Sequence, residues 1–241
     1  MKKRVAIVQS NYIPWKGYFD LMNMVDEFIF YDDMQYTKRD WRNRNKISTS
    51  SGLKWLTIPV SVKGRYLQKI NETTISDLGW AKKHWDTIRH VYHKAKFFKN
   101  YSQIFEEFYL NCEEIYLSKV NIRLIQIVNN ILQIETKLSS SEDFNLIDGK
   151  TERLLDLCKQ VGGDVYVTGL SAKDYFKEDL AESLGIEVEW MNYSSYPEYN
   201  QVNKPFEHGV SILDLIFNEG PNSYKFMKSF VLRNNLRNVI D

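Results

Sequence analysis

Amides and aromatic residues follow the first apolar segment of the chain, in the stretch VQSNYIPWKGYFDL that begins at Val8. Amide groups donate and accept hydrogen bonds, and aromatic rings supply stacking faces. Because tyrosine and tryptophan are poor turn formers, we interpret this stretch as a ligand-binding loop rather than a plain turn before a helix. Its candidate substrate-binding residues are Gln9, Asn11, Tyr12, Trp15, Lys16, Gly17 and Tyr18.

Three residues are candidates for proton transfer. Asp32 and Asp33 end a second apolar segment, EFIFYDD, where carboxylates serve as general bases, as ligands for a hydroxyl or an amine, or as Mg²⁺ ligands. The competing interpretation is a solvated strand end with one aspartate paired to Arg39 or Arg44. His208 stands alone in the sequence, but histidine moves protons near neutral pH. We take Asp32, Asp33 and His208 as the candidate catalytic residues.

Cationic and aromatic side chains alternate after the acidic pair, in MQYTKRDWRNRNKI. Guanidinium groups suit phosphates, and an indole suits the face of a base or a sugar. The candidate substrate-binding residues here are Gln35, Arg39, Trp41, Arg44, Asn45 and Lys46, and a solvated charged loop is the alternative. In the basic stretch after Trp80, His84 and Arg89 are candidates for a diphosphate contact. His90 and His93 lack a clear third ligand, so no metal site is expected.

Later strand ends and one helix start add a further group of candidates. Thr168, Gly169 and Ser171 follow an apolar stretch, and Ser211 and Asp214 begin an apolar helix-like segment. Free N–H groups at the start of a helix bind anions. The same residue types also cap helices and form turns, which is the competing interpretation.

The apolar periodicity predicts a doubly wound, mostly parallel Rossmann-like α/β sheet. Strands are expected at 5–9, 27–33, 135–141, 164–169 and 186–191, with helices at 17–25, 149–161 and 172–184. A strand at 54–62 belongs to a hairpin-like excursion. Three amphipathic stretches predict a helical insertion at 78–132 within a single domain of residues 1–241, and further helices are expected at 211–217 and within 221–241.

Parallel sheets bind ligands beyond the carboxyl ends of their strands, near the point where strand order reverses. We therefore expect the loop at 11–17 and the turn at 168–171 to meet there. The chain has no GxGxxG after its first strand, no Walker lysine loop and no G-x-S-x-G elbow. The commonest dinucleotide-binding, nucleotide-hydrolysing and α/β-hydrolase classes therefore lack their motifs.

Composition narrows the classes of partner. The formal net charge of +1 over 241 residues does not favour a nucleic-acid polymer or an anionic membrane as partner. Cys112 and Cys158 are too few for a disulfide framework. The N-terminus lacks the pattern of a signal peptide, and no apolar run has the length of a membrane span. We expect a soluble, cytoplasmic protein.

The stretch from Val8 to Ile47 resembles the opening of the WbqC-like protein family, and the resemblance resumes in WLTIPV, GGDVYVTGLSAKDYF, IEVEWMNY and HGVSILDLIFNEG. Members of that family occur among genes for bacterial surface polysaccharides such as O-antigen. The enzymes that build such polysaccharides use nucleotide-linked sugars, often amino sugars with unusual N-acyl groups, so the resemblance implies a substrate of this class. The chain also has a weaker likeness to the HIGH-motif nucleotidyltransferases. It lacks both histidines of that motif, because Trp15 and Tyr18 stand near those positions.

The resemblance implies this substrate class, and our leading hypothesis for the reaction is a transferase that N-acylates, and in one form aminoacylates, the amino group of a dTDP- or UDP-linked sugar. An acyl or peptidyl carrier protein is a further candidate partner. The acyl donor, a thioester or an acyl adenylate, is not visible in the sequence, which indicates no cofactor. Two alternatives stay open: an ATP-dependent amide ligase of the HIGH type and a non-catalytic nucleotide-sugar-binding protein.

Overall fold

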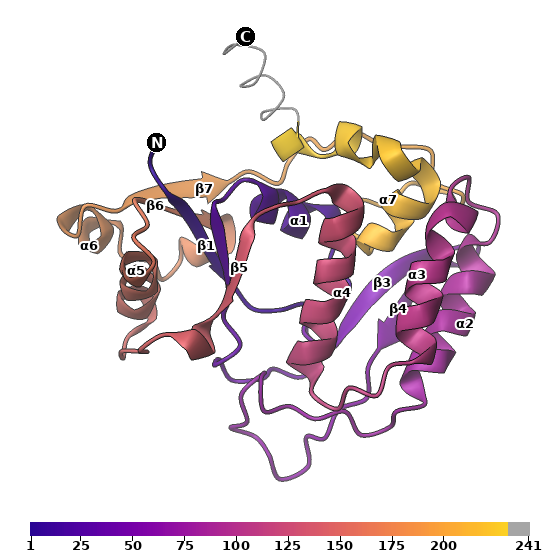
Figure 1. Ribbon diagram of the computed structural model, residues 1–241, viewed down its shortest axis with the longest axis horizontal. Helices are drawn as coiled ribbons and strands as arrows, with labels where there is room; N and C mark the ends of the chain where they lie inside the picture. The colour runs from indigo at the N-terminus through magenta and orange to yellow at the C-terminus, as the bar shows by residue number, and fades with distance from the viewer. Residues whose placement is uncertain (231–241) are drawn as a thin grey trace.

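Five parallel strands form the central sheet of the computed structural model, which describes residues 1–230 (Figure 1). They are β1 (Arg4–Val8), β2 (Glu27–Phe30), β5 (Lys137–Ser140), β6 (Val165–Gly169) and β7 (Glu187–Met191). Their order across the sheet is β5-β2-β1-β6-β7, and every neighbouring pair is parallel. The predicted Rossmann-like sheet is confirmed.

Helices cover both faces of this sheet, because successive strand residues point to opposite sides. In β1, Ala6 belongs to one buried cluster, while Val5 and Ile7 belong to another. The first cluster includes residues of α1 (Lys16–Asn23), α4 (Leu117–Leu132) and α7 (Ile212–Glu219). The second includes residues of α5 (Lys150–Gln160) and α6 (Glu178–Ser183). The arrangement is doubly wound, as predicted.

The direction of winding reverses between β1 and β6. From β1 the chain passes through α1 to β2 and later to β5, and it then returns past β1 to β6 and β7. The connections that leave β1 and β6 therefore start side by side at the carboxyl edge of the sheet and turn to opposite faces of it. Open α/β sheets bind their ligands at such a switch point.

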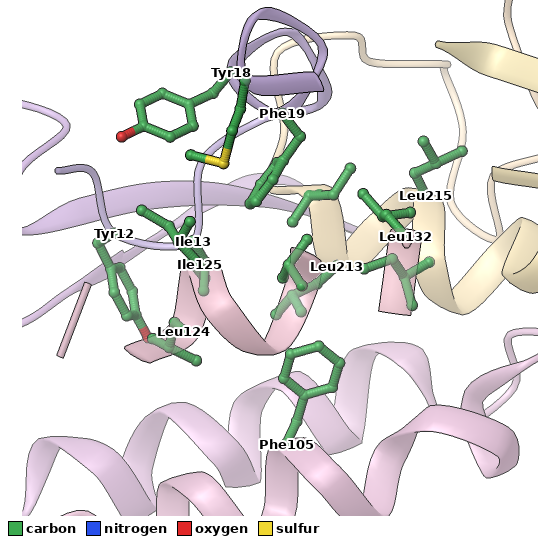
Figure 2. Close-up of a cluster of buried hydrophobic side chains, with 14 of the residues drawn as sticks. Tyr12, Ile13, Tyr18, Phe19, Phe105, Leu124, Ile125, Leu132, Leu213 and Leu215 are labelled. Carbon is green, nitrogen blue, oxygen red and sulfur yellow. The ribbon is translucent and has the colours of Figure 1, made fainter. Parts of the chain in front are cut away.

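A hairpin and two helices stand between β2 and α4. The hairpin consists of β3 (Arg44–Thr49) and β4 (Gly52–Thr57), and the helices are α2 (Trp80–Tyr92) and α3 (Phe98–Leu110). Phe105 of α3 points toward Leu213 of α7 in Figure 2. These helices thus share the buried cluster of the first sheet face, and they lie in the range where helices were predicted.

Two predicted elements differ from the structure. The helix expected at 172–184 is instead a 3-10 turn, η2 (Leu170–Ala172), followed by the short α6. Between them Phe176 packs against Tyr166, with ring centroids 5.5 Å apart. β4 ends at Thr57, and its partner β3 was not predicted because charged and amide side chains obscure the alternation of that strand.

Two 3-10 helices complete the described chain. One is η1 (Ser141–Asp143), directly after β5, and the other is η3 (Gly220–Phe226), directly after α7. Of the last predicted helix, within 221–241, residues 221–226 have 3-10 geometry and residues 228–230 are α-helical. Its part at 231–241 lies outside the described residues.

Candidate functional site

A cavity of about 650 Å³ lies at the switch point of the sheet. Gln9, Asn11 and Trp15 line it from the loop after β1, and Thr168, Gly169 and Ser171 line it from the end of β6. These two segments are more than 150 positions apart in the sequence, but the parallel topology puts the ends of β1 and β6 side by side. The structure thus brings together the two loops that the strand-end argument selected.

The N-terminus of α5 faces this cavity from the other side. Gly149, Lys150 and Arg153 line the cavity. Gly149 stands at the N-cap with a φ of 96° and provides no side-chain cap, but the carboxylate of Glu152 lies over it and accepts hydrogen bonds from the N–H groups of Thr151 and Glu152. Attraction for an anion therefore comes from Lys150 and Arg153, and Arg153 also contacts the carbonyl of Ile147 and, at 3.6 Å, the carboxylate of Asp148. The arrangement suits a phosphate or a diphosphate.

Tyrosines supply much of the remaining wall: Tyr18, Tyr31, Tyr166, Tyr175 and Tyr193. Burial raises the pKa of each phenol, and that of Tyr193 reaches about 12. The hydroxyls therefore stay protonated at neutral pH and can donate hydrogen bonds, while the rings offer stacking faces. Among the described residues, no Asp, Glu, His or Cys lines the cavity.

The loop after β1 is held in an unusual backbone conformation. Ile13 has a φ of 35°, which is rare for a β-branched residue. The buried Asn45 of β3 donates hydrogen bonds to the carbonyl oxygens of Tyr12 (3.1 Å) and Ile13 (2.8 Å). Such strain persists where the surrounding contacts over-determine it, as at ligand sites. Asn45 therefore shapes the loop rather than presenting its amide to the cavity.

Asp32 lies beneath the same loop. Its Oδ1 accepts a 2.8 Å hydrogen bond from the N–H of Ser10, and the residue is only 3% exposed. Its Oδ2 is buried with no hydrogen-bond partner among the described residues. Burial raises the pKa of Asp32 to about 6, against the hydrogen bonds from Ser10 and the charge of Arg42. The strand end is therefore buried rather than solvated.

The other two candidate catalytic residues do not line the cavity either. Asp33 contacts Lys69 at 3.2 Å and accepts a 2.6 Å hydrogen bond from Ser141. The ion-pair partner of Asp33 is therefore Lys69, and not Arg39 or Arg44 as the sequence interpretation had it. His208 is exposed and packs against Phe206, with ring centroids 4.7 Å apart. Asp32 is the only one of the three that contacts the cavity loop directly in the described structure.

A smaller hollow of about 260 Å³ lies beside the cavity. It is lined by Asn11, Pro14, Trp15, Trp41, Asn45 and Gly209, so Asn11 and Trp15 line both spaces. Trp41 packs against Trp55 of β4 with ring centroids 5.5 Å apart. Arg44 lies over Trp55 at 4.0 Å, and Lys46 lies 5.1 Å from the same ring. The predicted cluster of tryptophan and cations therefore stands at the edge of the site.

A model of the WbqC-like protein family matches residues 9–226 of this chain. The chain belongs to the WbqC-like protein family. Within that similarity, a protein of Mycobacterium tuberculosis (strain ATCC 25618 / H37Rv) named "Uncharacterized protein Rv1507c" is 50% identical over 226 residues, which cover 94% of this chain and 98% of that protein. No solved structure shows a significant match.

Several residues predicted to bind substrate lie in the core of this WbqC-like protein. Tyr12 is fully buried, and its hydroxyl contacts the Nδ1 of His84 at 2.8 Å and the hydroxyl of Tyr109 at 2.7 Å. Burial lowers the pKa of His84 to about 4, so its imidazole is neutral at physiological pH. The pair joins the first loop to α2 and does not line either space.

Lys16 is also buried, although it directly follows Trp15. Its ammonium lies 4.9 Å from the ring of Tyr196 and 5.2 Å from that of Tyr199. Burial lowers the pKa of Lys16 to about 8. Asp214 accepts hydrogen bonds from the hydroxyls of Tyr92 and Tyr199, at 2.9 and 2.8 Å. Lys16 and Asp214 therefore bind to other buried side chains and do not line the cavity.

The remaining candidates also have structural partners. Ser211 caps α7 through a 3.3 Å hydrogen bond from the N–H of Leu213. Gln35 donates to the carbonyl of Tyr66, and Arg89 lies on the exposed side of α2. Arg39 is exposed, and its carbonyl accepts from the guanidinium of Arg44. None of these four candidates lines either space.

Sequence reasoning missed part of the cavity of this WbqC-like protein. The residues not selected from the sequence include Lys150, Arg153, Tyr31, Tyr166, Tyr175 and Tyr193. One signal was present for the two cations, because they begin the helix after the third strand of the sheet, where N–H groups face the ligand edge. The tyrosines carried no such signal, since core tyrosines share their pattern.

Residues 1–230 contain neither a cluster of metal ligands nor a helix that could span a membrane. No three side chains of His, Cys, Asp or Glu lie together in a way that could hold a metal ion. No described helix has both the length and the apolar character needed to cross a membrane.

Proposed function

We propose that this WbqC-like protein binds a nucleotide-linked amino sugar in the cavity at the switch point and transfers an acyl group to the sugar amine, in the biosynthesis of a surface glycan such as O-antigen. The single observation that supports this function is the cavity wall itself. The side chains of Lys150 and Arg153 suit a diphosphate, and tyrosine rings suit a base. Family membership supports a biosynthetic role and gives no reaction, so acyl transfer is our hypothesis for this ligand.

The proposed reaction joins the amine nitrogen to an acyl carbonyl carbon. The new C–N bond replaces the bond to the leaving group, a thiolate or AMP, and the amine gives up a proton. Hydroxyls such as that of Tyr193, which keep their protons at neutral pH, can donate to the developing oxyanion. Asp32 lines neither space, but it is mostly ionised above pH 6 and contacts the loop at Ser10, so we propose that it receives the amine proton by relay rather than by direct contact, with Asp33 and His208 as alternatives.

A second candidate function is favoured by what the described lining contains. Because no Asp, Glu, His or Cys of residues 1–230 lines the cavity, a nucleotide-sugar-binding protein without catalysis fits the same wall. Binding needs the cations and the rings but no base. The two candidates therefore share a ligand and differ only in turnover.

The test is a binding measurement followed by a turnover measurement. Calorimetry with UDP, dTDP and their amino-sugar conjugates should give saturable binding, and no binding of any of them would overturn both candidates. Mass spectrometry of mixtures with acyl-coenzyme A, or with ATP and a carboxylic acid, should then detect the N-acylated sugar. Binding without product in either mixture selects the non-catalytic candidate, whereas AMP release would indicate an acyl adenylate.

If product forms, three variants assign the base. Removing a general base typically lowers the rate about 10²- to 10⁴-fold. We expect that loss for Asp32→Asn, and smaller effects for Asp33→Asn and His208→Gln. A normal rate for Asp32→Asn together with a large loss in one of the others would move the assignment to that residue.

A further inference from the structure

The smaller hollow beside the cavity has a wall that differs from the wall of the cavity. Pro14, Trp15 and Trp41 give it two indole rings and a proline. The cavity instead has the cations Lys150 and Arg153 at the start of α5. The cationic groups are therefore on the α5 side, and the apolar rings are on the hairpin side.

Polar groups in the hollow are few. The Nδ2 of Asn45 is used by the carbonyls of Tyr12 and Ile13, and its Oδ1 accepts a 2.7 Å hydrogen bond from the N–H of Lys46. Asn11 also lines the hollow, but its Oδ1 is buried and has no partner among the described residues. A nucleobase edge requires several donors and acceptors in register, and one amide side chain does not supply them. A ring with an apolar face and a hydroxyl at its edge matches this wall better.

Trp15 is held in place from both sides. Its indole folds onto Gly17 and packs against Tyr193 and Tyr196, with ring centroids 5.5 and 5.6 Å away. Trp41 packs on Trp55 and is nevertheless 42% exposed. A fixed ring and a partly exposed ring thus meet at the hollow, and the exposed one has surface left for a ligand.

We propose that this hollow is the sugar subsite: the pyranose ring packs its C–H face on Trp41, while Asn11 binds a ring substituent. This inference rests on the proposed function and deepens it. Because Asn11 and Trp15 line both spaces, one nucleotide-linked sugar spans them, with its diphosphate at α5 and its sugar beside the hairpin.

The experiment compares ligands with and without the sugar. Calorimetry gives the dissociation constants of UDP and UDP-N-acetylglucosamine, and of dTDP and dTDP-glucose, for each variant. The dissociation constant of the bare nucleotide divided by that of the nucleotide-sugar measures how much the sugar contributes to binding. Trp41→Ala should lower that ratio roughly 3- to 10-fold and leave the constant of the bare nucleotide unchanged. Trp41→Phe should restore part of the ratio.

A matched control and two contrary outcomes make the test decisive. Tyr66→Ala removes an aromatic ring that is 79% exposed and lines neither space, so all constants should stay at wild-type values. If Trp41→Ala leaves the ratio unchanged, or weakens both ligands equally, the sugar subsite is wrong while the proposed function stands. If the wild type binds no nucleotide and no nucleotide-sugar, both are wrong.

Discussion

Trp15 folds back over Gly17 so closely that a Cβ at residue 17 would lie 2.7 Å from the Cε2 atom of the indole. The glycine is therefore required by a tryptophan two positions earlier, and not by a ligand that approaches the backbone. Since Trp15 lines both the cavity and the hollow, this contact sets the wall that the two spaces share.

Replacing Gly17 by alanine tests that relationship. Alanine in the first turn of α1 would ordinarily stabilise a helix by about 0.5–1 kcal/mol relative to glycine. Here we expect the added methyl group to displace the indole, so that nucleotide-sugar binding weakens although the helical circular dichroism is retained. Binding of the wild-type strength by a folded Gly17→Ala protein would contradict the role of the contact.

The cations at the start of α5 predict a selective loss of anion binding. Arg153→Ala and Lys150→Ala should each weaken UDP binding roughly 10- to 100-fold, because hydrogen bonds to charged groups contribute about 1.5–3 kcal/mol. Isothermal titration at several salt concentrations measures the effect. Lys159→Ala, in the last turn of the same helix, is the matched control and should bind normally. Equal losses in all three would indicate a general charge effect instead.

The buried carboxyl of Asp32 predicts a pH-dependent stability. Its pKa is raised from 3.8 to about 6, so the folded state binds the proton more tightly than the unfolded state. The protonated carboxyl therefore contributes about 3 kcal/mol to the free energy of unfolding below pH 4, and this contribution is lost as the pH rises through 6. In urea titrations from pH 4 to 7, Asp32→Asn should gain stability relative to the wild type. Parallel curves would contradict this expectation.

The buried Lys16 predicts that the stability of the fold increases with pH in the alkaline range, opposite to the effect of Asp32. Burial lowers its pKa from 10.5 to about 8, so the unfolded state binds the proton more tightly. The charged form costs about 3 kcal/mol below pH 8, and this cost disappears as the pH rises toward 10.5. Lys16→Met should therefore be more stable than the wild type at pH 7, with the difference shrinking by pH 10. A difference that does not depend on pH would contradict the assignment.

Local patterns sufficed for the sheet and for the two loops, after β1 and after β6, that line the cavity. Apolar runs such as VAIV and VYVT predict buried strands, and helices between them force a parallel order. Once the order is parallel, the residues after the strands must share an edge, which places Asn11 near Ser171 without coordinates. The structure confirms that these two loops meet.

Patterns did not separate a binding side chain from a core side chain. Tyr12 and Trp15 belong to the same loop, but only Trp15 lines the cavity, while the hydroxyl of Tyr12 enters the helical core beside His84. The difference depends on the turn at Ile13, which Asn45 of a distant hairpin holds. No periodicity within the loop encodes such a contact.

The sequence by itself determined the order and type of the principal elements, because strand and helix periods are properties of neighbouring residues. It also determined the strand-end loops at which a ligand site forms. Only the tertiary structure decided that Lys150 and Arg153 face those loops, that Lys16 and Asp214 do not, and that Trp41 stands beside Trp15. The physical reason is that burial and proximity depend on how the twisted sheet, the hairpin and the helices pack, and packing joins residues that are far apart in the chain.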